Sequence, residues 1–126
     1  MGNEHGVFRV SVQGNIVMAR LSGCFNESGA EAVTDQIRSA IESFEGQPFC
    51  MLMNVLECPG GTPEAYENIE NYNGWLNGQK MTAKAMVMSS KMTEGILKDR
   101  APSRQNQKIK IFDNETDAIT WLEKHI

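Results

Sequence analysis

The sequence has no long apolar run, no secretory signal and no pattern of paired cysteines. None of its apolar stretches approaches the ~20 residues that span a membrane, and its first residues lack the basic and apolar segments of a signal peptide. Its cysteines, Cys24, Cys50 and Cys58, are odd in number and have no Cys-x-x-Cys spacing. We therefore expect free thiols and a cytoplasmic location, without a disulfide framework or a zinc site.

Positive charge is also scarce. The chain has 12 Lys and Arg residues against 16 Asp and Glu residues, so its net charge of −4 gives no electrostatic footprint for nucleic acid. His5 and His125 lie near opposite ends, far from any cluster of cysteines or carboxylates. No metal site and no cofactor are expected. With 126 residues, of which 40% are hydrophobic, the chain is expected to form one domain over residues 1–126.

The most apolar stretch, residues 49–56, is followed by a glycine turn and a helix start. Because this stretch is continuously apolar rather than alternating, both faces of the strand are expected to be covered, as in the middle of a parallel sheet. Thr62 is a good N-cap, and Pro63 suits the first helical position. The turn between them and the strand is therefore expected at the carboxyl edge of the sheet, where ligands bind in α/β folds.

Periodicity and turn signals divide the rest of the chain. Strands are expected at residues 7–12, 16–21, 49–56, 83–88 and 108–112. Helices are expected to begin near Ser28, Thr62, Ser90 and Glu115. For the first of them, Ser28 and Glu31 have capping-box spacing. The order β-β-α-β-α-β-α-β-α predicts an α/β fold. Its sheet would be mostly parallel and five-stranded, with an N-terminal antiparallel hairpin strand and helices on its faces.

Three parts of the sequence resemble the STAS-like family, and in particular its SpoIIAA-like branch. They are Gly23 before the first helix, the buried strand that ends near Asn54, and a C-terminal strand and helix marked by residues 109–112, Ala118, Ile119, Trp121 and Leu122. The branch has the fold of anti-sigma-factor antagonists and is akin to CRAL-TRIO-type lipid-binding domains; its members are mostly bacterial and uncharacterised. The resemblance implies a non-enzymatic regulatory module that binds a partner protein or a small apolar, lipid-like ligand.

The chain departs from that family at the phosphorylation segment. Anti-sigma-factor antagonists carry an Asp-Ser-Ser-Gly-like segment at the start of the second helix, whereas residues 57–63 here read Glu-Cys-Pro-Gly-Gly-Thr-Pro. The nearest hydroxyl is that of Thr62, whose oxygen is expected to cap the helix. A phosphorylation-controlled regulator therefore stays an alternative, with Thr62, Ser89 or Ser90 as the phosphoacceptor.

Two groups of residues are candidates for ligand binding. The turn before the second helix can form an anion-binding nest or simply cap the helix. Methionines on two central strands, beneath that helix, can line an apolar cavity or simply fill the core. The predicted ligand-binding residues are Cys58, Gly60, Gly61, Thr62, Tyr66, Ile69, Met86 and Met88.

A thiol enzyme is a further alternative. Cys58 precedes a helix N-terminus, where a thiolate is stabilised, but residues 60–68 contain no Arg to hold an anionic substrate. An unreactive thiol is the competing interpretation, and we predict no catalytic residues. A homodimer is also an option, because an edge strand and two tryptophans beside the helix stripes, Trp75 and Trp121, are available.

Overall fold

A computed structural model describes residues 6–58, 61–89 and 108–125. These residues form one five-stranded sheet in the order β1-β2-β3-β4-β5, in which β1 is antiparallel to β2 and the other pairs are parallel. The elements are β1 (Val7–Gln13), β2 (Ile16–Ser22), α1 (Glu27–Glu42), β3 (Phe49–Glu57), α2 (Pro63–Leu76), β4 (Met81–Val87), β5 (Ile109–Phe112) and α4 (Glu115–Glu123). The predicted fold class is confirmed, and the helix predicted to begin near Ser90 lies outside the described residues.

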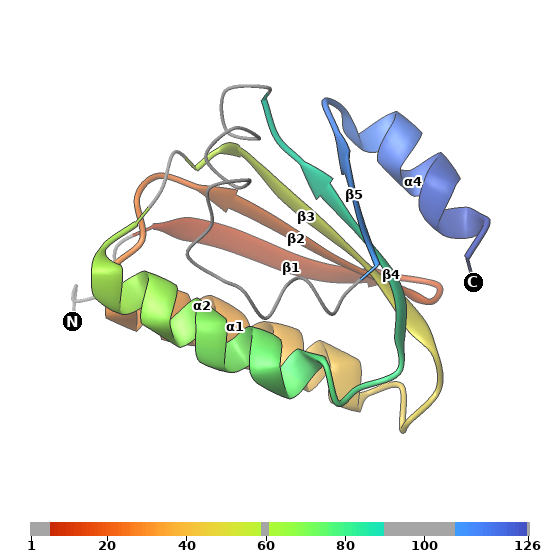
Figure 1. Cartoon of the computed structure of the whole chain (residues 1–126), viewed down its shortest axis with the longest axis horizontal. Helices are drawn as coiled ribbons and strands as arrows, with labels where there is room; N and C mark the ends of the chain where they lie inside the picture. The colour runs from red at the N-terminus through yellow and green to blue at the C-terminus, as the bar shows by residue number, and fades with distance from the viewer. Residues whose placement is uncertain (1–5, 59–60, 90–107, 126) are drawn as a thin grey trace.

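The sheet is covered by helices on both faces. Figure 1 shows α1 and α2 side by side on one face and α4 on the other. α1 and α2 pack against each other, while α4 packs on β3, β4 and β5. This arrangement follows from the strand order. Successive parallel strands with right-handed crossovers place their connecting helices on the same face.

β3 is the central strand, as its continuous apolar sequence predicted. Its neighbours are β2 and β4, and its side chains from Phe49 to Met53 are all buried. β1 and β5 form the two margins. Both margins are less buried than β3: β1 alternates exposed and half-buried residues over its first four positions, and β5 has the exposed Lys110 between two half-buried isoleucines.

Two of the three described helices begin where the sequence indicated. Thr62 caps α2, with Pro63 in the first turn, and Asn114 caps α4 immediately before Glu115. The predicted start of α1 was wrong by two residues. Its N-cap is Asn26, whose Oδ1 accepts from the Gly29 amide at 2.9 Å, so Ser28 lies inside the helix. Both residues suit an N-cap, and Asn26 is the one whose backbone is extended.

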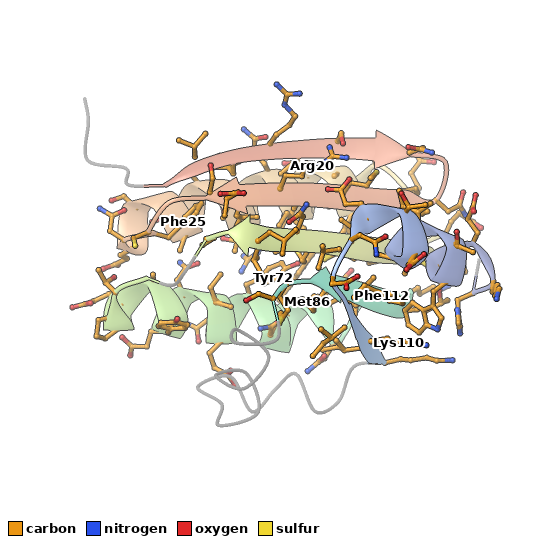
Figure 2. All side chains as sticks on the ribbon, turned by 90° about the horizontal axis from the view of Figure 1, so that it is seen from above. Arg20, Phe25, Tyr72, Met86, Lys110 and Phe112 are labelled. Atoms are coloured by element: carbon orange, nitrogen blue, oxygen red, sulfur yellow. The ribbon has the colours of Figure 1, made fainter. Side chains whose placement is uncertain are left out.

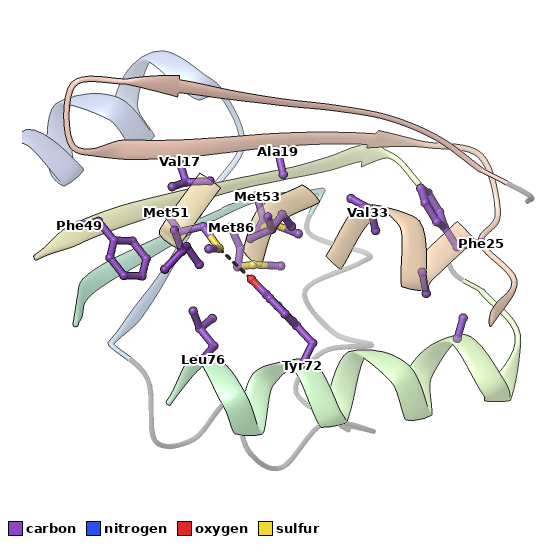
Figure 3. Close-up of a cluster of buried hydrophobic side chains, with 14 of the residues drawn as sticks. Val17, Ala19, Phe25, Val33, Phe49, Met51, Met53, Tyr72, Leu76 and Met86 are labelled. Atoms are coloured by element: carbon purple, nitrogen blue, oxygen red, sulfur yellow. Dashed lines mark hydrogen bonds between the residues drawn. The ribbon is translucent and has the colours of Figure 1, made fainter. Parts of the chain in front are cut away.

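The larger core lies between the sheet and the pair α1 and α2. Alternate residues of the central strands point into it, among them Met51, Met53 and Met86 (Figure 3). Tyr72 enters from α2 with only 1% of its surface exposed, and its hydroxyl donates to Met51 Sδ at 3.3 Å. Methionine adapts to irregular gaps between a sheet and two helices, which fits its use here.

The smaller core lies beneath α4. It uses the opposite faces of the same strands and contains Ile16, Met18, Cys50, Leu52, Ala83, Ala85, Val87, Ala118 and Leu122. Three of these are alanines, on β4 and α4, so the helix can approach the sheet closely. Figure 2, viewed from this side, shows that α4 leaves the margin formed by β1 uncovered.

Candidate binding site at the carboxyl edge of the sheet

The loops that follow β2 and β3 are joined side by side. Phe25 and Gly61 form an isolated parallel bridge, in which the Thr62 amide donates to the Phe25 carbonyl at 2.9 Å. A second bond runs from the Gly23 amide to the Glu57 carbonyl at 2.8 Å. α1 and α2 therefore begin next to each other at the carboxyl edge of the sheet.

The close approach of the two loops requires glycine at position 61. A Cβ atom built on Gly61 would lie 2.7 Å from the backbone oxygen of Phe25. Real Cβ atoms essentially never come so close to a backbone atom, so any side chain here would push the loops apart. Gly61 thus contributes to the site through the space it leaves free, while Gly60 lies outside the described residues.

Thr62 is exposed and already serves as a helix cap. Its hydroxyl accepts from the Ala65 amide at 3.2 Å, and its own amide is bonded to Phe25. Two of the amides at the start of α2 are thus occupied by acceptors within the protein. Anion binding at this turn remains a prediction, and it would need other amides or a change in this cap.

Most of the other predicted ligand-binding residues contact the core rather than the solvent. Cys58, Ile69, Met86 and Met88 all contact the core between the sheet and α1–α2, and the two methionines are only 5% and 2% exposed. Tyr66 is half-buried in the second turn of α2. The structure thus places the two methionines in the core, behind the loops that follow β2 and β3, rather than on an open surface.

Two of the candidate phosphoacceptors and two of the three thiols lie at the carboxyl edge of the sheet. Thr62 is exposed and Ser89, just after β4, is half-buried, whereas Ser90 lies outside the described residues. Cys58 is half-buried, with its amide bonded to the Val55 carbonyl at 2.9 Å, and Cys24 in the neighbouring loop is exposed.

A polar cluster that we did not predict lies on the α4 face of the sheet. Arg20, on β2, donates from Nε and Nη2 to the two carboxylate oxygens of Glu115, both at 2.8 Å. Asn54, the neighbour of Arg20 on β3, donates to Glu115 Oε2 at 2.6 Å. One sign of this cluster is visible in the sequence: Arg20 and Asn54 are polar residues within two adjacent strands that are otherwise mostly apolar.

The charges of this cluster stabilise one another. The hydrogen bonds from Arg20 lower the pKa of Glu115 below its ordinary value of 4.5, against the opposing effect of burial. The same bonds raise the pKa of Arg20. Glu115 is also the first residue of α4, where the helix dipole favours negative charge. The cluster therefore anchors α4 to the sheet.

Within residues 6–58, 61–89 and 108–125, no three metal-binding side chains gather, and no helix is long and apolar enough to cross a membrane.

Two solved structures share this architecture. An uncharacterised protein of the DUF3478 family with a SpoIIAA-like fold, from Shewanella loihica PV-4, matches with a TM-score of 0.72 and 15% identity, over 97% of each chain. The anti-sigma factor antagonist SpoIIAA in its unphosphorylated form matches with a TM-score of 0.61 and 16% identity, over 93% of this chain and 98% of that one. No family model and no curated protein matches the sequence.

The chain has an α/β fold with a mixed five-stranded sheet. More particularly, its fold is the SpoIIAA-like one, as the resemblance in the sequence implied.

Proposed function

We propose that the chain is a non-enzymatic regulatory module of the cytoplasm that docks a partner protein at its rim surface. The rim surface consists of residues 23–26, 61–62 and the exposed side of α2. One solved structure of the same fold is that of an anti-sigma factor antagonist, and the other is that of an uncharacterised protein. The role of the anti-sigma factor antagonist supports a regulatory function for this fold.

The bridge between Phe25 and Gly61 carries this proposal. It fixes the two loops that begin α1 and α2 at the carboxyl edge of a parallel sheet. Ligands and partners of α/β folds bind at this edge because the loops there are free to vary on a rigid scaffold. The side chain of Phe25 is only 5% exposed, so it anchors the bridge in the core. The exposed parts of the two loops therefore form a preformed surface.

The packing behind the rim favours a protein over a small apolar ligand as the occupant. Met86, Met88 and Tyr72 would line a cavity beneath α2, but each is buried against its neighbours. α1 and α2 pack directly on each other, because successive strands place them on the same face. A lipid-like ligand would therefore have to open a closed core. Native mass spectrometry of protein purified from its host should show no species that carries the additional mass of a small apolar ligand.

Charge reversal on the rim tests the docking surface. Glu67 is exposed on α2, and Glu123 is exposed on α4 across the sheet, so E67R and E123R form a matched pair. Affinity enrichment from the native host should recover one defined partner with the wild type and E123R, and lose it with E67R. Equal recovery with E67R, or no partner with any variant, would contradict the proposal.

Phosphorylation of Thr62 is the second candidate function, because Thr62 is exposed at the joined helix starts. A phosphate there would add negative charge beside the N-terminus of α2 and so change the charge and the shape of the rim surface. Intact-mass analysis of the protein from its native host should then show a phosphorylated fraction that T62V abolishes. If the host protein carries no phosphate, or if T62V leaves it in place, this candidate is wrong.

A further inference from the structure

β1 is an edge strand whose protection against pairing is limited to one charged residue, Arg9. Among the described strands it pairs only with β2, so every second residue directs its backbone N–H and C=O groups away from the sheet. The opposite edge, β5, is four residues long, is preceded by Lys108 and carries Lys110. β1 is seven residues long, contains no Lys or Pro, and pairs with β2 without a register shift. Short strands, lysines, prolines and bulges are how proteins block such edges.

The same strand carries two exposed apolar side chains, one on each face of the sheet. Three large apolar side chains of the described residues are exposed, and two of them are on β1: Val7 at 70% and Val12 at 47%. The third is Leu56, near the end of β3, at 40%. An uncovered apolar margin beside free backbone groups is a surface for another strand.

We propose that two copies of this chain pair through β1 in an antiparallel register centred on Val10. In this register Phe8 of one copy lies opposite Val12 of the other, and Val7 lies opposite Gln13. Phe8, Val10 and Val12 share the face of the sheet that α1 covers, since their β2 partners Leu21, Ala19 and Val17 belong to that core. The apolar row of one copy therefore continues directly into that of the other.

Symmetry and charge select this register over its neighbours. Residues directly opposite each other in an antiparallel pair share a face, so the two-fold axis must pass midway between one residue of β1 and the same residue of the other copy. An axis at Arg9 would pair only residues 7–11 and set two guanidinium groups directly opposite each other, which is unfavourable. An axis at Ser11 would pair only residues 9–13 and leave Phe8 without a partner.

The register at Val10 uses the whole strand and avoids both problems. All of residues 7–13 pair, and Arg9 lies opposite Ser11 of the other copy. The two Arg9 side chains are then diagonal neighbours, about 7–8 Å apart rather than face to face. One strand from each copy makes a small interface, so the dimer is expected to depend on concentration.

Sedimentation of a concentration series tests the pairing. The wild type should shift from monomer to dimer, and V12K should weaken dimerisation by about tenfold, because the change removes two symmetry-related Val12–Phe8 contacts. L56K removes a comparably exposed side chain outside β1 and should leave the equilibrium unchanged. A wild type that stays monomeric throughout, or a dimer that V12K leaves intact, would overturn the proposal.

Cysteine cross-linking tests the register without relying on a weakened variant. In a background with Cys24 and Cys58 changed to Ser, single cysteines replace Arg9, Val10, Ser11 or Val12 in turn. Oxidation should cross-link V10C most efficiently, because Val10 faces itself across the axis. V12C should not cross-link, because its two copies lie roughly 14 Å apart along the strands. A maximum at any other position, or no cross-link at Val10, would contradict the proposed register.

Discussion

The guanidinium of Arg20 holds both carboxylate oxygens of Glu115, at 2.8 Å each, and so ties α4 to a strand 95 positions earlier in the chain. α4 packs mainly on β3, β4 and β5, and this ion pair extends its attachment to β2. The Arg20 side chain is 41% exposed and that of Glu115 is 26% exposed, so solvent screens the pair in part. Its contribution to stability is therefore that of a well-oriented surface pair rather than a buried one.

The pair makes stability depend on pH in the acidic range. The pKa of Glu115 is lowered in the folded state, so its contribution is present above the ordinary value of 4.5 and is lost as pH falls through the folded value. E115Q should lower the free energy of unfolding by about 0.5–1 kcal/mol at pH 7. It should also reduce the further loss of stability between pH 7 and acidic pH. Urea unfolding at pH 7 and pH 3 measures both effects. The control E123Q, on the exposed side of α4, should behave as the wild type, and an unchanged acid loss in E115Q would contradict this account.

Gly61 should be intolerant of alanine, since the added Cβ would lie 2.7 Å from the Phe25 oxygen. We expect G61A to lose about 1–3 kcal/mol of stability by forcing the two loops apart. Gly74 provides the matched control, because it lies inside α2 and a Cβ added there would meet nothing within 4 Å. G74A should gain about 0.5–1 kcal/mol from the better helix propensity of alanine. Chemical denaturation measures the free energy of unfolding of both variants. If G61A is as stable as the wild type, the bridge is not a tight contact.

Tyr72 should make stability fall at high pH. Burial raises the pKa of its hydroxyl, so the folded state favours the protonated form, and stability is lost as pH rises above the ordinary value of 10.0. Y72F should remove that loss while changing stability at pH 7 by no more than about 1 kcal/mol, because the thioether of Met51 is a weak acceptor. Y66F, which removes a hydroxyl from the same helix, should still lose stability at alkaline pH as the wild type does. Thermal unfolding between pH 8 and pH 11 measures the difference.

The three thiols should react in the order of their exposure. Cys24 is exposed, Cys58 is half-buried and Cys50 is fully buried, so an alkylating reagent should modify Cys24 first and Cys50 only after unfolding. Peptide mapping of a time course at neutral pH gives the three rates. If Cys58 reacts faster than Cys24, it is an activated thiol, and the enzymatic alternative replaces the binding module.

The fold was predictable because several local signals agreed. At the start of α2, the N-cap Thr62 and the proline after it point to the same boundary, and the structure has it there. At the start of α1, Asn26 and Ser28 are both suitable caps, and local sequence could not rank them. In the structure, the residue just before Asn26 is held by a contact distant in sequence, the hydrogen bond from the Thr62 amide to the Phe25 carbonyl.

The site was predictable only in part, because its contacts are distant in sequence. The double glycine indicated a tight turn, but nothing local showed that Gly61 would meet Phe25. The methionines were placed correctly on central strands, yet an apolar strand looks the same beside a cavity and in a filled core. Arg20 and Glu115 carry ordinary surface charges, and only the register of the sheet brings them together.

Photo-cross-linking in the native host tests the rim surface most directly. A photoreactive amino acid replaces Glu67 on the rim surface or Glu123 on α4, both of which are exposed. Position 67 should give one defined adduct of this chain with another protein, and position 123 should give none. Adducts from position 123 alone, or from neither position, would contradict a partner-binding rim.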